Sequence, residues 1–281
     1  MNFFVSSNAI DRDINNVAKI GSAHNFNMEF SSNIKYSKLN LDVFNNYKFP
    51  KLTHNYFPAS EIPFVFNLAS LDPFVLSKTL SICKKNIQIA SELEIPIYSC
   101  HAGFAFDTSS DNLGNSFNFN RNDFDLYYSK FLFNLEKILE YSVSLGVTLL
   151  IENNVTINSN YINGYTPLIC SSHDSILGIA EKFKCDNFGI LFDTAHYKVS
   201  SKTFCENVNI DSLYPHIKAI HHSDNNGLVD SNDILNNNYW WFEKARPVPN
   251  CIYQVLEIKK SPISVIKKQL NLIKKKYDTG I

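Results

Sequence analysis

Eight short hydrophobic runs recur along the chain, and most are followed by a stretch in which hydrophobic residues return every three or four positions. The runs have the length of strands, and the spacing between them is typical of amphipathic helices. Some runs are hydrophobic at consecutive positions, which is typical of strands covered on both faces. The predicted strands are 3–7, 26–30, 51–55, 95–101, 147–152, 188–193, 217–221 and 252–257.

Three segments give the clearest helical pattern: residues 75–93, 123–145 and 262–276. The last of these places its lysines on the face opposite its hydrophobic residues. Eight strand–helix units in 281 residues fit an α/β fold of the (β/α)₈ TIM-barrel type. No linker rich in Pro, Gly or Ser divides the chain, so we expect one domain over residues 1–281.

Two polar segments, residues 104–121 and 153–168, are too long to be simple connections. Each follows the carboxyl end of a predicted strand, and active sites of barrels are built at that end. We therefore consider two interpretations for them: lids or contacts between subunits, and polar insertions on the surface.

Charge and composition exclude some classes of protein. The chain has 26 basic and 27 acidic residues, a formal net charge of -1, so it has no general attraction for nucleic acids or anionic lipids. No hydrophobic run approaches the roughly 18 to 20 residues that span a bilayer. The first residues lack the pattern of an export signal, and the six cysteines form no C-x-x-C pair. We expect a cytoplasmic protein with reduced thiols.

Six of the eight predicted strands end in a side chain that can bind a metal ion. Strand ends meet at one mouth of a barrel, so these side chains are expected to face a common volume. One carboxylate at a strand end is often only a loop cap, but three in one mouth require a compensating cation. Three imidazoles and three carboxylates therefore predict a site for a divalent metal. The six residues are His54, His101, Glu152, Asp193, His221 and Glu257.

Two further histidines need separate treatment. His221 and His222 are adjacent, so only one can point into the mouth, and His221 shares the face of Ile217 and Ala219. We predict that His221 is the ligand and that His222 packs behind it. His196, three residues after Asp193, is predicted to bind substrate or to orient a ligand.

The chain resembles the xylose isomerase-like TIM-barrel superfamily, which includes sugar isomerases, ketose 3-epimerases, inosose dehydratases and endonuclease IV. The likeness depends on the order of short stretches: LTHNYFP, FNLAS, YSCHAG, LLIENN, GILFDTAHY, IKAIHHSD and YQVLEI. The resemblance implies a metal held by Glu152, Asp193, His221 and Glu257. It also implies that His54 and His101 match a second metal site of endonuclease IV-like members, bridged by Glu152.

The resemblance also separates the subfamilies. Endonuclease IV-like enzymes add a third metal through the position of His196 and an Asp-x-His motif after the seventh strand. Here that segment reads LVDSNDILNNN, with Asp230 and Asp233 but no histidine. A zinc phosphoesterase acting on abasic DNA is therefore the alternative rather than the leading hypothesis, and no nucleic-acid partner is expected.

The leading hypothesis is a divalent-metal-dependent isomerase, epimerase or dehydratase that acts on a small sugar, sugar phosphate or cyclitol. The ion, Mn, Co, Mg or Zn, would polarise a carbonyl and stabilise an enediolate. Glu152 and Glu257 would act as the acid/base pair, while Asp193 and His221 hold the ion. A third hypothesis is a non-catalytic or oxidative metalloprotein that uses the same barrel.

Candidates for substrate binding are His196, Asn153 beside Glu152, and two residues of the aromatic segment 238–246. In that segment Trp241 could lie against a sugar face, and Arg246 could bind an anionic group. The alternative for this segment is a helix that packs on the outside of the barrel. A homo-oligomer is possible, but no residue pattern marks a contact face.

Overall fold

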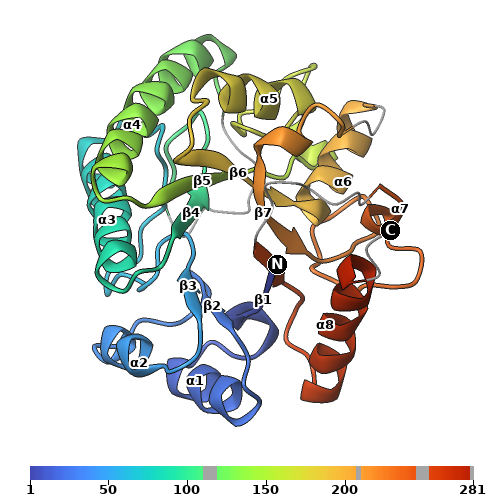
Figure 1. Cartoon of the computed structure of the whole chain (residues 1–281). Helices are drawn as coiled ribbons and strands as arrows, with labels where there is room; N and C mark the ends of the chain where they lie inside the picture. Colours follow the sequence, from blue (N-terminus) through green and yellow to red (C-terminus); the bar gives the residue numbers. More distant parts are fainter. Residues whose placement is uncertain (110–118, 207–209, 245–252, 279–281) are drawn as a thin grey trace.

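The computed structural model is a single α/β domain in which eight parallel strands form a nearly closed barrel. It describes residues 1–109, 119–206, 210–244 and 253–278. Helices lie around the outside of the strands (Figure 1). The strands are β1 (Asn2–Ser6), β2 (Met28–Phe30), β3 (Lys51–Thr53), β4 (Ile97–His101), β5 (Thr148–Glu152), β6 (Phe188–Asp193), β7 (Ile217–His222) and β8 (Tyr253–Leu256).

The sheet runs in the order β3-β2-β1-β8-β7-β6-β5-β4, so β3 and β4 are its two edges. A single parallel bridge between His54 and Ser99 joins these edges. Next to it, the backbone N–H of Asn55 donates to the carbonyl of Ser99 at 2.8 Å. The seam of the barrel therefore closes at one of the predicted metal ligands, which ties the position of His54 to β4.

Side-chain caps begin several of the helices, α3 among them. Asp72 accepts hydrogen bonds from the backbone N–H groups of Phe74 and Val75, and Pro73 occupies the first turn of α3, where it costs no hydrogen bond. The α-helices of the described residues are α1 (Ile14–Ala23), α2 (Asn40–Asn46), α3 (Pro73–Glu92), α4 (Phe124–Ser144), α5 (His173–Lys182), α6 (Thr194–Phe204), α7 (Trp240–Lys244) and α8 (Ile263–Asp278).

An aromatic cluster fills the space between the barrel wall and α2. Phe30 of β2 packs edge-on against Phe44 of α2 at 5.1 Å between ring centroids, and Phe57 contacts both rings. Side chains alternate across a strand, so Phe30 on the outer face places its neighbour Glu29 inside the barrel.

The predicted strands agree with the observed ones except at their ends. The second strand begins at Met28 rather than at residue 26, because Asn25 turns the chain with a φ of 52° and Phe26 is hydrogen-bonded to Gly21 in the preceding turn. The third strand ends before Asn55, which has a φ of 56°. Residue 252 of the predicted last strand lies outside the described residues.

The two long polar segments contact one another. Phe104 forms an antiparallel bridge with Leu168, and the guanidinium of Arg121 lies 3.4 Å from the ring centroid of Tyr165. Residues 110–118 of the first segment lie outside the described part of the chain. A lid or subunit contact stays a prediction for both segments.

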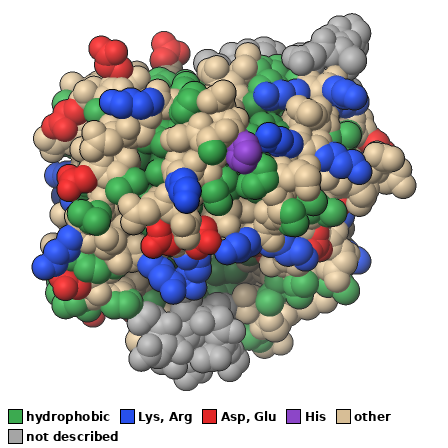
Figure 2. Space-filling model, turned by 90° about the horizontal axis from the view of Figure 1, so that it is seen from below, with side chains coloured by type: hydrophobic (Ala, Val, Ile, Leu, Met, Phe, Trp, Pro, Cys, Tyr) green, Lys and Arg blue, Asp and Glu red, His purple; other side chains and the backbone are tan. Residues whose placement is uncertain are grey.

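The molecular face seen from below the view of Figure 1 carries basic and acidic side chains interspersed with hydrophobic ones (Figure 2). Among the described residues, no helix combines the length and apolarity needed to cross a bilayer.

We expect Phe44→Ala to lower the free energy of unfolding by about 3–5 kcal/mol, because it opens a cavity in the aromatic cluster. Phe44 is fully buried. The matched control is Phe133→Ala on α4, where the side chain is 50% exposed. Urea unfolding followed by circular dichroism measures both. Equal losses for the two variants would contradict the packing described here.

Candidate metal centre

The carboxyl ends of four strands bring together one oxygen or nitrogen atom from each of four side chains. Glu152 ends β5, Asp193 ends β6, His221 lies near the end of β7, and Glu257 follows β8. Their donor atoms all lie within 4.8 Å of one another. All are buried except Glu257, whose side chain is 15% exposed. The predicted four-residue set therefore forms one compact group.

The Nδ1 atom of His221 lies at the centre of this group. It is 2.5 Å from Oε2 of Glu257, 3.3 Å from Oε1 of Glu152 and 3.8 Å from Oδ2 of Asp193. Three carboxylates thus lie close to one imidazole nitrogen, and donor atoms this close to one another can share one ion.

A second group adjoins the first through Glu152. The Nε2 atoms of His54 and His101 lie 3.1 and 3.3 Å from Oε2 of Glu152, while His221 faces the other oxygen. His54 is held in place because its Nδ1 is hydrogen-bonded to Ser99 at 2.9 Å. The structure thus brings all six predicted ligands together, with Glu152 between the two groups.

Asp193 has two functions at the end of β6. Its Oδ1 accepts a hydrogen bond from the backbone N–H of His196 at 2.8 Å and caps α6, while Oδ2 faces the site. Asn153 braces the same point, since its amide group donates to the carbonyl of Asp193 and accepts from the N–H of Asp193. Asn153 is fully buried. The structure uses its amide in this brace, and a contact of Asn153 with substrate stays a prediction.

His196 lies beside the cluster with both ring nitrogens engaged. Nδ1 donates to the carbonyl of Asn153 at 2.8 Å, and Nε2 donates to Oδ2 of Asp230 at 3.2 Å. Burial opposes the charged ring, but the carboxylates of Asp193 and Asp230 raise the pKa of His196 well above its ordinary value. Asp233 pairs instead with Lys259 at 2.5 Å. A role of His196 in substrate binding stays a prediction.

The described part of the aromatic segment, residues 238–244, includes α7, which packs against the barrel. Trp241 has no exposed surface, its indole N–H donates to Tyr277 at 2.7 Å, and its ring lies 5.2 Å from that of Phe192. The structure therefore places Trp241 in the core and corrects the expectation that it lines a sugar site. Arg246, the predicted anion-binding residue, lies outside the described residues.

His222 points away from the cluster. Its Nε2 is 2.6 Å from Oε1 of Gln254, and its Nδ1 is 3.2 Å from the hydroxyl of Tyr239. The alternation of β7 therefore sends His221 inward and His222 outward, as the face shared by Ile217 and Ala219 predicts.

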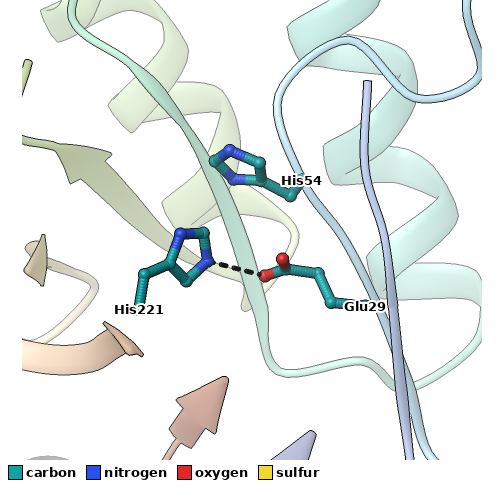
Figure 3. A group of neighbouring side chains, drawn as sticks. All are labelled: Glu29, His54 and His221. Carbon is teal, nitrogen blue, oxygen red and sulfur yellow. Dashed lines mark hydrogen bonds and ion pairs between the residues drawn. The ribbon is translucent and has the colours of Figure 1, made fainter. Parts of the chain in front are cut away.

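Glu29 of β2 is the site residue that the sequence analysis missed. Its side chain is buried, and Oε2 accepts a hydrogen bond from Nε2 of His221 at 3.1 Å (Figure 3). Glu29 does not end its strand, so a search for polar residues at strand ends passes over it. The available signal was a carboxylate between Met28 and Phe30, inside a predicted strand.

The charges of the cluster depend on one another. Burial alone would raise the pKa of Glu152, but the surrounding histidines lower it well below its ordinary value. Burial alone would lower the pKa of His221, but the surrounding carboxylates, Glu257 foremost, raise it well above its ordinary value. Burial raises the pKa of Asp193 to about 7. The carboxylates at this mouth therefore stabilise positive charge on a histidine, and they would stabilise a bound cation in the same way.

Buried donor atoms favour the fit of a metal ion. Oε2 of Glu152, Oδ2 of Asp193 and Nδ1 of His221 are buried and have no partner of good hydrogen-bond geometry among the described residues, although the first and third contact charged neighbours. Buried polar atoms are normally paired, and unpaired ones are costly. A divalent ion would satisfy all three with ligand types that such ions commonly use.

The sequence matches the family model described as "Xylose isomerase-like TIM barrel" over residues 28–265, most of the chain. The chain therefore belongs to the xylose isomerase-like TIM-barrel family, as the sequence resemblance predicted. No curated protein matches the sequence.

Solved structures of similar fold include a D-tagatose 3-epimerase-like protein, with a TM-score of 0.71 and 20% identity over 100% of this chain and 98% of the other. The TTHB071 protein of Thermus thermophilus, soaked with ZnCl2, has a TM-score of 0.64 and 18% identity over 98% of this chain and 99% of the other. D-Psicose 3-epimerase of Clostridium cellulolyticum, with D-tagatose, has a TM-score of 0.62 and 12% identity over 100% of this chain and 98% of the other. At these identities the likeness establishes the fold.

We expect Asn153→Ala to lower the free energy of unfolding by about 1–3 kcal/mol, because it leaves buried backbone groups of Asp193 without partners. The control is Asn45→Ala, which removes an exposed amide from α2. Chemical denaturation compares the two variants with the wild type. An Asn153→Ala variant as stable as the control would show that the brace contributes nothing.

Proposed function

We propose that the protein is a divalent-metal-dependent sugar isomerase or epimerase whose ion is held by Glu152, Asp193, His221 and Glu257. The supporting observation is the convergence of these four donor atoms within 4.8 Å, at the barrel end where active sites form. The sugar epimerases among the structures of similar fold favour a ketose substrate.

Glu152 and Glu257 are suited to proton transfer because they approach Nδ1 of His221 from different strands. One carboxylate would remove the proton from the carbon beside the substrate carbonyl, and the other would return a proton. Return to the opposite face of the same carbon gives epimerisation, and return to the neighbouring carbon gives isomerisation. Expulsion of a hydroxide instead would give dehydration. A bound divalent ion would supply Lewis-acid polarisation of the carbonyl.

Asp193 and His221 would hold the ion and take no part in proton transfer. Asp193 is fixed by its cap on α6 and by the brace from Asn153, so its free oxygen has one position. Rigid placement of this kind lowers the cost of orienting substrate and ion together.

A second candidate, a zinc phosphoesterase of the endonuclease IV type, is favoured by the second group of His54, His101 and Glu152. The two candidates differ in metal content, because phosphodiester cleavage of this type uses several ions in one cluster. The contact of His196 with Asp230 supplies only part of a third site, since the segment after β7 provides no histidine.

We expect elemental analysis of protein purified without added metal or chelator to find about one exchangeable divalent ion per chain. Asp193→Asn should lose most of it, because the free carboxylate oxygen at Oδ2 is replaced. Asp233→Asn, which alters an exposed ion pair, is the control and should keep the ion. Two or more tightly held zinc ions would favour the phosphoesterase, and cleavage of abasic DNA would then be measured.

We expect Glu257→Gln to reduce turnover by about 10²- to 10⁴-fold, because an amide cannot exchange a proton with the substrate. The assay would follow D-tagatose, D-psicose and D-fructose in D₂O and measure both the epimer formed and deuterium at the reacting carbon. The control is Glu136→Gln, an exposed residue of α4. A Glu257→Gln variant with unchanged rate and deuterium uptake would remove Glu257 from the acid/base pair.

A further inference from the structure

Glu29 and His221 meet across the interior of the barrel. They are 192 residues apart in sequence, and β1 and β8 separate their strands in the sheet. Both side chains are almost completely buried. A buried carboxylate is costly unless it is paired, so the contact is a specific arrangement rather than a surface ion pair.

The hydrogen bond determines which nitrogen of His221 is available. An ionised carboxylate only accepts, so Nε2 must carry the hydrogen that it donates to Oε2 of Glu29 at 3.1 Å. In the neutral ring the lone pair then lies on Nδ1, the atom that faces Glu152, Asp193 and Glu257. Figure 3 shows the bonded nitrogen of His221 turned toward Glu29, with His54 beside the pair.

The contact also fixes the orientation of the imidazole ring. Rotating the ring by half a turn about the Cβ–Cγ bond would put ring carbons where the two nitrogens now lie, and it would leave the buried Glu29 carboxylate without this donor. Metal-binding histidines are commonly oriented by a carboxylate on their second nitrogen, which also makes the ring a stronger ligand.

We propose that Glu29 is a positioning residue that holds His221 with Nδ1 toward the metal and increases the affinity of the site without binding the ion. This inference rests on the proposed function, because it assumes the four-residue metal site. The neighbouring group Glu29, His54 and His221 offers the opposing possibility that Glu29 is itself a ligand.

The test is metal binding by Glu29→Gln, which keeps the shape of the side chain and an acceptor oxygen but removes the charge. Competition with a chromogenic chelator measures the affinity for Co²⁺ and Zn²⁺, and elemental analysis measures the number of ions per chain. We expect affinity to fall about 10- to 100-fold with an unchanged number of ions at saturation. Excess metal should then restore turnover in Glu29→Gln but not in Glu257→Gln.

The matched control is Gln254→Met, which removes the partner of another buried imidazole, His222, on the outer side of the same strand. It should cost stability and leave metal affinity unchanged. Affinity equal to wild type in Glu29→Gln, or an equal loss in Gln254→Met, would overturn the positioning role.

Loss of a whole ion per chain in Glu29→Gln would also overturn the proposal, because it would make Glu29 a ligand. A wild-type protein that binds no divalent ion would instead refute the proposed function and this inference with it. Circular dichroism of each variant shows whether the fold is retained. The failure of the positioning role and the failure of the metal site therefore give different results.

Discussion

The structure depends on the compensation of buried negative charge at the mouth of the barrel. Four carboxylates, from Glu29, Glu152, Asp193 and Glu257, lie close to one imidazole, that of His221. Charges of one sign at this range repel, and burial removes the water that would otherwise screen them. Histidines supply part of the compensating positive charge, and a bound cation would supply the rest.

The rest of the fold holds these groups at fixed positions. Asp193 caps α6 with one oxygen, Asn153 braces the backbone at Asp193, and the bridge at His54 closes the barrel seam. Each device satisfies a structural requirement of the barrel and at the same time orients a donor atom. The site is therefore built on strand ends and caps, which hold side chains more precisely than loops do.

The strand pattern predicted most of the site, because parallel strands end at one mouth and a polar residue after a hydrophobic run stands out. Alternation along β7 also separated His221 from His222. The same reasoning failed at Glu29, which precedes the end of its strand, and at Trp241. Trp241 is in the core because α7 packs on the barrel. Contacts between distant elements decided these cases.

The sequence by itself determined the number of the strands and the barrel class, and it predicted the six candidate donor residues, since these follow from periodicities that act over a few residues. Only the tertiary structure decided which nitrogen of His221 faces the carboxylates and that Glu29 contacts the other nitrogen. The physical reason is that hydrogen bonds and charges act across the barrel, between residues as far apart as Glu29 and His221, and no local pattern records such pairings.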